Sequence, residues 1–189
     1  MPNDLLKSTW VFGDSYYSHD AEARHPYYLY AEGYKDWLLN NKGGIASPSS
    51  LADLKELLNL GHSPKYVVWG LGMNDGIDID EDTPNESWLS CIMQVIDLCE
   101  KRNITPILCT IPNALGENLS PAVNYYHGGK SKWVRNSGYR YIDYALAVGS
   151  TDDGYWYDGC KGIDIHPTPM GAKMLAQQMM IDFPEIMAK

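Results

Sequence analysis

The sequence has no long hydrophobic run and no cluster of basic residues. Its 189 residues include 15 Lys and Arg against 24 Asp and Glu, a net charge of −9. Because nucleic-acid-binding surfaces need clustered positive charge, no nucleic-acid partner is expected. No apolar run approaches the roughly 18 residues of a membrane span, so no membrane partner is expected either.

The start of the sequence also lacks an export signal. Residues 1–7 read MPNDLLK, without the basic segment and apolar stretch of a signal peptide. The sequence as given therefore predicts a cytoplasmic protein. A secreted chain from which a signal peptide had been removed would look the same.

The four cysteines do not form a disulfide pattern. Cys91 and Cys99 lie eight residues apart on one expected helix, too far to bridge, and Cys109 lies inside an apolar run typical of a strand. We expect all four, Cys160 included, to be reduced thiols that pack in the interior.

The pattern of apolar segments predicts an α/β fold. A chain of this length with 44% hydrophobic residues is interpreted as one domain, residues 1–189, without repeats or linkers. Strands are expected at residues 9–12, 66–71, 104–111 and 139–142. Helical patterns alternate with them, which favours crossover connections and hence a parallel sheet covered on both faces.

Four helices are expected between and after these strands. They cover residues 27–39, 49–60, 85–103 and 169–180, and the last starts with a proline in its first turn. No clear strand is visible between the first two helices. Residues 112–138 are expected to be irregular, as a rim of the site or as a loop before an amphipathic helix.

Three polar motifs lie where such a fold would place a site. Ser15 follows the first strand in FGDS, Asn74 follows the second in GMND, and His166 comes shortly before the last helix. Histidine suits the removal of a serine proton near neutral pH, and an asparagine amide can donate to a developing oxyanion. Each motif alone is weak evidence for catalysis, since Gly-Asp-Ser and Asn-Asp-Gly are common turns. Their order and positions together favour a catalytic site.

These motifs resemble the SGNH, or GDSL-type, hydrolase family, from residue 11 to about residue 171. The resemblance implies a three-layer α/β/α sandwich with a mostly parallel central sheet, and a serine esterase that needs no metal and no cofactor. It implies that Ser15 is the nucleophile and His166 the base. The oxyanion hole would comprise the Ser15 amide, a glycine amide and the Asn74 side chain. Gly44 is the favoured glycine, with Gly43 next.

The acid that orients His166 departs from the family pattern. The family's usual position, three residues before the histidine, is occupied by Ile163, and Asp164 is one residue closer. Pro167 biases His166 toward an extended conformation, in which residues two apart point to the same side. Asp164 is therefore the favoured acid. Asp158 and a backbone carbonyl, which would leave a Ser-His dyad, remain alternatives.

The substrate class is inferred from the aromatic residues, which comprise 14 Tyr and 6 Trp but only 2 Phe. Amphipathic aromatics can stack on sugar rings, although each of them can also simply be part of the core. Those near the motif loops are Tyr16, Tyr17, Tyr125, Tyr126, Trp133, Tyr155, Trp156 and Tyr157. We expect a small-molecule acyl ester as substrate, with an acetylated sugar preferred. A thioesterase, a lysophospholipase and a non-catalytic carbohydrate-binding relative remain alternatives.

Overall fold

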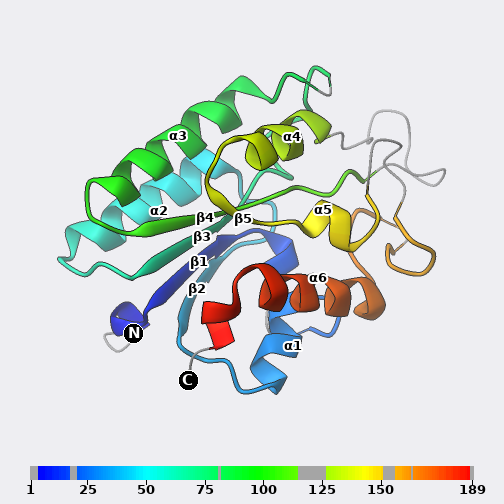
Figure 1. Cartoon of the computed structure of the whole chain (residues 1–189), viewed down its shortest axis with the longest axis horizontal. Helices are drawn as coiled ribbons and strands as arrows, with labels where there is room; N and C mark the ends of the chain where they lie inside the picture. Colours follow the sequence, from blue (N-terminus) through cyan, green and yellow to red (C-terminus); the bar gives the residue numbers. More distant parts are fainter. Residues whose placement is uncertain are drawn as a thin grey trace.

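The computed structural model contains a five-stranded, entirely parallel sheet in the order β2-β1-β3-β4-β5 (Figure 1). It describes residues 4–17, 21–80, 82–114, 127–150, 156–162 and 164–187. The strands are β1 (Thr9–Gly13), β2 (Trp37–Asn41), β3 (Tyr66–Gly70), β4 (Thr105–Cys109) and β5 (Arg140–Ile142).

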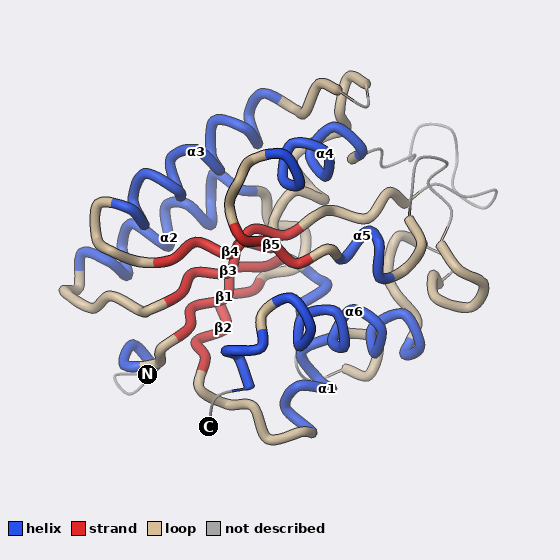
Figure 2. The backbone as a smooth tube through the Cα atoms, in the orientation of Figure 1, coloured by secondary structure: helices blue, strands red, loops and turns tan. Residues whose placement is uncertain are grey.

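Helices cover both faces of this sheet (Figure 2). One face is covered by α2 (Ser47–Asn59), α3 (Glu86–Glu100) and α4 (Gly128–Asn136), and the other by α1 (His25–Ala31), α5 (Tyr144–Ala147) and α6 (Pro169–Asp182). Among the described residues there are also short 3-10 helices η1 (Asp4–Leu6), η2 (Ser15–Tyr17) and η4 (Pro184–Met187). The predicted α/β/α sandwich with a parallel sheet is confirmed.

Alternating side chains of the strands supply the two halves of the core. In β1, Trp10 and Phe12 pack toward α2 and α3, whereas Val11 packs toward α1 and α6. All three are fully buried because both faces of the sheet are covered. The four cysteines are free and buried, as expected.

The expected helix over residues 27–39 is wrong in its second half. Helix α1 ends at Ala31, Gly33 follows at φ +91°, and the chain then forms β2. Strand β2 pairs only with β1, so it is an edge strand with one buried and four half-buried residues. Its short apolar run next to a tyrosine-rich helix gave no clear strand pattern. It is also the strand that the sequence did not show ahead of Gly43 and Gly44.

Helix α4 occupies the end of the segment that we expected to be irregular. It begins at Gly128, and residues 115–126 before it lie outside the described residues. The predicted aromatic candidates Tyr125, Tyr126 and Tyr155 lie outside them too. No helix of the described chain is both long and apolar enough to cross a bilayer.

The strand order places the site. The chain passes from β1 outward to β2 and then back to β3 on the other side of β1. In open parallel sheets, ligands bind outside the carboxyl ends of the strands where the direction of winding reverses. Here that position lies between the ends of β1 and β3, which are the strands that precede Ser15 and Asn74.

Candidate active site

Ser15 lies in a tight turn directly after β1. The Asp14 carboxylate accepts a hydrogen bond from the Tyr16 amide at 3.0 Å, and the Asp14 carbonyl accepts one from the Tyr17 amide at 3.1 Å. Aspartate favours such turns because its short side chain can bond to the backbone two residues on. The turn ends the strand at the carboxyl edge and leaves Ser15 partly exposed.

His166 reaches the same edge from the segment before α6. The Gly162 amide donates to the His166 carbonyl at 2.8 Å, and Lys161 and Pro167 form an isolated antiparallel bridge. The Thr168 hydroxyl then caps α6 by accepting a hydrogen bond from the Gly171 amide. The histidine is therefore held between a short antiparallel pairing and the start of a helix.

The structure brings Ser15, His166 and Asp164 together. Ser15 Oγ lies 2.8 Å from His166 Nε2, and His166 Nδ1 lies 3.0 Å from Asp164 Oδ2. Asp164 Oδ1 also accepts a hydrogen bond from the His166 backbone amide at 2.9 Å. These bonds from His166 lower the pKa of Asp164, although its side chain is 60% exposed. The short Asp164 side chain thus does reach the ring.

Asp158, the alternative acid, is exposed, and no described hydrogen bond joins it to His166. The contacts therefore favour Asp164 between the two carboxylates.

Asn74 lies on the loop after β3. Gly72, two residues earlier, has φ +149°, and a Cβ there would lie 2.8 Å from Ile111, so this bend requires glycine. Asn74 Nδ2 donates to the Ile45 carbonyl at 3.0 Å. Because an amide nitrogen carries two hydrogens, this bond fixes the side chain and leaves a second hydrogen for a ligand.

Gly43 and Gly44, which precede Ile45, form the third segment at this edge of the sheet, beside those of Ser15 and Asn74. The Ile45 amide donates to the Lys42 carbonyl at 3.3 Å, and Gly44 has φ +71°, a conformation that favours glycine at the third position of a turn. A Cβ built on Gly43 would lie 4.0 Å from Ser15 Cβ, whereas one on Gly44 would meet nothing within 4 Å. Gly43 thus faces Ser15 across the site, whereas a side chain at Gly44 would project into open space.

Asp75 beside Asn74 has a structural role. Its carboxylate accepts hydrogen bonds from the Ser47 amide and the Ser47 hydroxyl, both at 2.9 Å. These bonds cap the start of α2, and together with the Asn74 bond they tie the loop after β3 to the glycine turn.

The comparisons with known proteins show the family to which the chain belongs. The model of the family described as GDSL-like Lipase/Acylhydrolase matches residues 11–179. The chain belongs to this family. It is therefore a carboxylic-ester hydrolase by family, and the site just described lies within the matched residues.

Solved structures of related folds cover nearly the whole chain. A G-D-S-L family protein from Desulfitobacterium hafniense DCB-2 has a TM-score of 0.69 at 17% identity, covering 93% of this chain and 99% of its own. The acetyl xylan esterase AlAXEase has a TM-score of 0.63 at 20% identity, with 93% and 99% covered. A mutant of an acetyl-xylooligosaccharide esterase from Geobacillus has a TM-score of 0.63 at 15% identity, with 92% of each chain covered. Among curated proteins, no sequence matches this chain.

In this GDSL-like hydrolase, most of the aromatic candidates that the structure describes belong to the interior. Tyr16, Tyr17 and Trp156 are at most 8% exposed, and Trp133 packs against the core. Tyr157 is the exception in the described part of the chain, at 56% exposure. The rings of Tyr16, Tyr17 and Trp156 are thus too buried to stack on a sugar.

Tyr16 has a different role, which the sequence analysis missed. Its hydroxyl donates to the Ile165 carbonyl, and its ring centroid lies 5.7 Å from that of His166. The residue after Ser15 therefore contacts the segment that carries His166. The only sequence signal was its position directly after Ser15.

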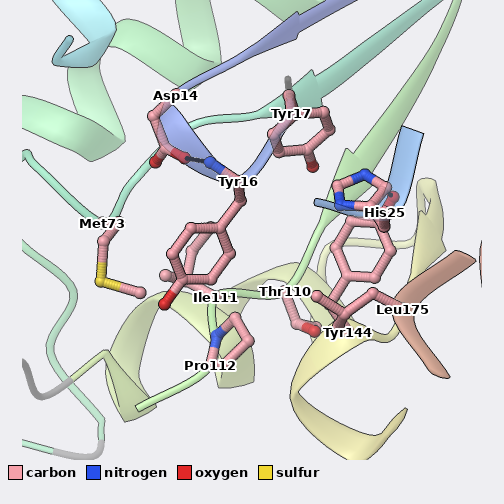
Figure 3. Close-up of a pocket in the computed structure, with 11 residues that line it drawn as sticks. Asp14, Tyr16, Tyr17, His25, Met73, Thr110, Ile111, Pro112, Tyr144 and Leu175 are labelled. Atoms are coloured by element: carbon pink, nitrogen blue, oxygen red, sulfur yellow. Dashed lines mark hydrogen bonds between the residues drawn. The ribbon is translucent and has the colours of Figure 1, made fainter. Parts of the chain in front are cut away.

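A cavity of about 20 Å³ is lined by Tyr16 and by residues at the ends of β3 and β4 (Figure 3). Asp14 and Met73 line it on one side of Tyr16 in this view, and His25 and Tyr144 on the other. Burial is the main cause that raises the pKa of Asp14 to about 7; the hydrogen bond from the Tyr16 amide opposes the rise, and the nearby Asp75 carboxylate adds to it. In contrast, burial lowers the pKa of His25 to about 3.

Asp14 gives the first testable prediction, a pH-dependent loss of stability. In the unfolded chain Asp14 loses its proton near its ordinary pKa of 3.8, but in the folded protein it does so only near 7. Between these values the folded state binds more protons, so stability falls as the pH rises from about 4 to about 7. The loss amounts to at most about 4 kcal/mol for such a pKa difference.

Urea unfolding of the wild type and of Asp14→Asn at pH 5, 6, 7 and 8 measures this effect. The amide keeps an acceptor for Tyr16 but does not titrate, so the variant should gain stability relative to the wild type as the pH rises. The buried His25 and His127 have lowered pKa values and act in the opposite direction. They are present in both proteins and cancel in the difference. A difference that does not change with pH would contradict the prediction.

Proposed function

We propose that this protein is a serine esterase that removes small acyl groups, acetyl in particular, from carbohydrate esters. The observation that carries the proposal is the 2.8 Å contact between Ser15 Oγ and His166 Nε2 at the strand edge that also holds Asn74. Nucleophile and base within hydrogen-bond distance, with a third group on the base, are the arrangement that nucleophilic catalysis needs.

In the proposed acylation step, Ser15 Oγ attacks the carbonyl carbon of the ester while His166 Nε2 takes the hydroxyl proton. The carbonyl oxygen becomes an oxyanion. It would accept hydrogen bonds from the Ser15 amide, the amide of Gly44 or Gly43, and the free hydrogen of Asn74 Nδ2. When the intermediate collapses, the bond to the alcohol breaks, and the His166 proton passes to the leaving oxygen. Ser15 is left as an acyl ester.

Deacylation repeats these roles with water. His166 Nε2 removes a proton from a water molecule, whose oxygen attacks the acyl carbon through a second oxyanion. Ser15 then leaves with the proton from His166, and the carboxylic acid is released. Throughout, Asp164 would hold the proton of the ring on Nδ1, so that Nε2 is free to accept, and stabilise the imidazolium that forms.

The preference for acetylated carbohydrates has two supports. Acetyl xylan and acetyl-xylooligosaccharide esterases are among the proteins of similar fold. In addition, Tyr157 is 56% exposed on the loop whose residues 160–162 pair with the His166 segment. A tyrosine ring at the rim of a site can stack on a sugar while its hydroxyl forms hydrogen bonds.

A thioesterase or lysophospholipase is the second candidate, and one observation favours it. Ile77 and Ile79, which follow Asn74 on the same loop, are 57% and 75% exposed. Exposed apolar side chains beside the site are what a longer acyl chain would contact. A non-catalytic carbohydrate-binding relative without a working acid is less well supported, because Asp164 contacts His166.

The acyl chain-length profile tests the proposal. With p-nitrophenyl acetate, butyrate, hexanoate and octanoate, we expect kcat/KM to be highest for acetate and about tenfold lower for octanoate, since a site shaped for a small group must be strained to accept extra methylenes. An increase with chain length would favour the second candidate instead. Absence of hydrolysis of every ester would favour the non-catalytic relative.

A further inference from the structure

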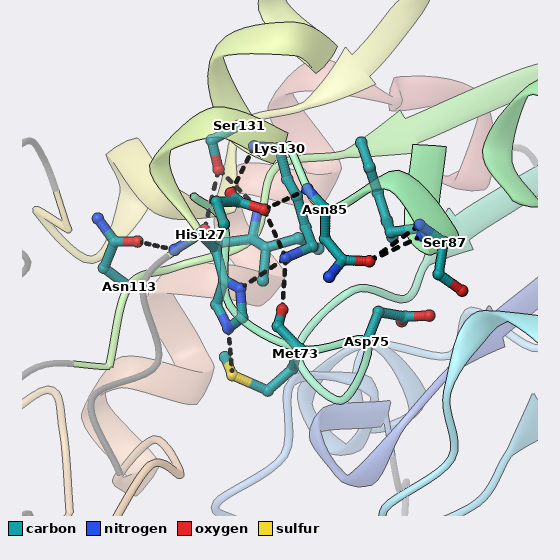
Figure 4. Close-up of polar contacts among 12 residues, drawn as sticks. Met73, Asp75, Asn85, Ser87, Asn113, His127, Lys130 and Ser131 are labelled. Carbon is teal, nitrogen blue, oxygen red and sulfur yellow. Dashed lines mark hydrogen bonds and ion pairs between the residues drawn. The ribbon is translucent and has the colours of Figure 1, made fainter. Parts of the chain in front are cut away.

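A buried ion pair joins α4 to the connection after β3, which also carries Asn74 (Figure 4). Lys130 Nζ lies 2.8 Å from Asp78 Oδ1, and both side chains are completely excluded from solvent. The Lys130 backbone amide donates to Asp78 Oδ2 at 2.8 Å as well. Helix α4 therefore binds both oxygens of one carboxylate through a single residue.

The ammonium of Lys130 has three hydrogens and three acceptors. Besides Asp78, it donates to the Gly76 carbonyl at 2.7 Å and to His127 Nδ1 at 3.1 Å. Because His127 Nδ1 accepts, the proton of the neutral ring is on Nε2, which lies 3.2 Å from Met73 Sδ. Burial lowers the pKa of His127 well below its ordinary value, in agreement with a neutral ring.

Three acceptors of this network lie close to Asn74 along the chain, on both sides of it. Met73 precedes it, and Gly76 and Asp78 follow it, so α4 and the residue before it contact residues 73–78 at three points. From the other side, Asn74 donates to Ile45 and Asp75 accepts from Ser47. The loop is thus fixed between α4 and the start of α2.

Stability alone is a weak explanation for such a pair. The desolvation of two buried charges largely offsets their attraction, and replacing both by uncharged groups of similar size is often neutral. What a fully bonded buried cluster does provide is one fixed arrangement of the backbone to which it bonds. Here that backbone carries the Asn74 amide.

We propose that Lys130, together with Asp78 and His127, is a positioning group that holds the Asn74 loop where its amide can donate to the oxyanion. The proposal rests on the oxyanion role of Asn74 in the proposed function. Lys130 itself does not contact the substrate and acts only through the loop.

The test compares two double variants. Lys130→Met/Asp78→Asn removes both buried charges at nearly constant volume. Lys132→Met/Asp82→Asn removes an exposed ion pair that also joins α4 to the connection between β3 and α3. With p-nitrophenyl acetate, the first should lower kcat by about 10²-fold, the effect of misplacing a catalytic group by about 1 Å, with KM within about twofold. The control should stay within about twofold of the wild type in both constants.

The same substitutions on an Asn74→Ala background separate positioning from general loss of structure. Asn74→Ala alone should lower kcat by about 10²-fold to 10³-fold. Once the amide is gone, loss of the buried pair should cost less than about threefold more, because the two changes remove the same interaction. Equal losses on both backgrounds would overturn the positioning role.

The outcomes distinguish this proposal from the proposed function. If Asn74→Ala has the same kcat as the wild type, the oxyanion assignment fails, and the positioning role fails with it. If Asn74→Ala loses activity but the folded Lys130 double variant does not, only the positioning role fails. Should that double variant not fold, Met73→Leu removes the His127 contact with a volume-conserving change. It should lower kcat by about threefold or more on the wild-type background only, and an unchanged kcat would overturn the proposal.

Discussion

Ser15→Ala is expected to remove essentially all hydrolysis of p-nitrophenyl acetate, a loss of about 10³-fold or more in kcat. Without the hydroxyl there is no atom to form the acyl ester, and only the binding groups and the oxyanion donors remain. The fold should be unaffected, because the side chain is partly exposed and its described hydrogen bond is to His166 alone.

Ser63→Ala is a matched control for this variant. Ser63 is exposed and precedes β3, so it lies at the opposite edge of the sheet from the site. Its replacement should leave kcat and KM within about twofold of the wild type. Melting curves of both variants should coincide with that of the wild type. Near-normal turnover by a folded Ser15→Ala protein would refute the assignment of the nucleophile.

Asp164→Asn is expected to lower kcat by about 10³-fold to 10⁴-fold, near the effect of amidating the acid of a catalytic triad. The Asn side chain can still accept from the His166 backbone amide, as Asp164 Oδ1 does at 2.9 Å. Its NH₂ group would then face Nδ1, which turns Nδ1 into an acceptor and moves the ring proton to Nε2. A histidine in that tautomer cannot take the Ser15 proton.

Asp164→Ala makes the tautomer explanation testable. Because the Asp164 side chain is 60% exposed, water can replace the carboxylate at Nδ1, and neither tautomer is imposed. The alanine variant should therefore lose less activity than the asparagine variant, by about tenfold or more in kcat. Asp158→Asn serves as the control and should leave kcat within about twofold. Losses below tenfold for both Asp164→Asn and Asp158→Asn would instead indicate a dyad oriented by a backbone carbonyl.

The sequence by itself determined the layered fold and the position of its polar motifs. Buried parallel strands are continuous apolar runs, as in residues 66–70, and helices such as α3 and α6 carry caps and periodic apolar faces that are visible locally. These signals depend on a few neighbouring residues. The same holds for Ser15 and Asn74, because the end of a strand already implies the edge of the sheet at which its next residue lies.

Only the tertiary structure decided the features that depend on partners distant in the sequence. Strand β2 is an edge strand that exists through its pairing with β1, and its own residues do not show it. The burial of Tyr16 and its bond to Ile165 depend on a segment 149 residues away. The contact of Asp164 with His166 needed the actual backbone geometry, since an extended segment fixes the side but not the reach of a short side chain.

Lys130 shows most clearly why the sequence was insufficient. In GGKSKW, Lys130 and Lys132 look alike, and both would be expected on a solvated helix face. The fold buries the first against Asp78 and leaves the second 52% exposed beside Asp82. Whether a charged side chain is stabilised by contacts within the protein or by water depends on which elements pack over it. That is decided by the packing of α4 on the loop after β3, not by the residues next to Lys130 in the chain.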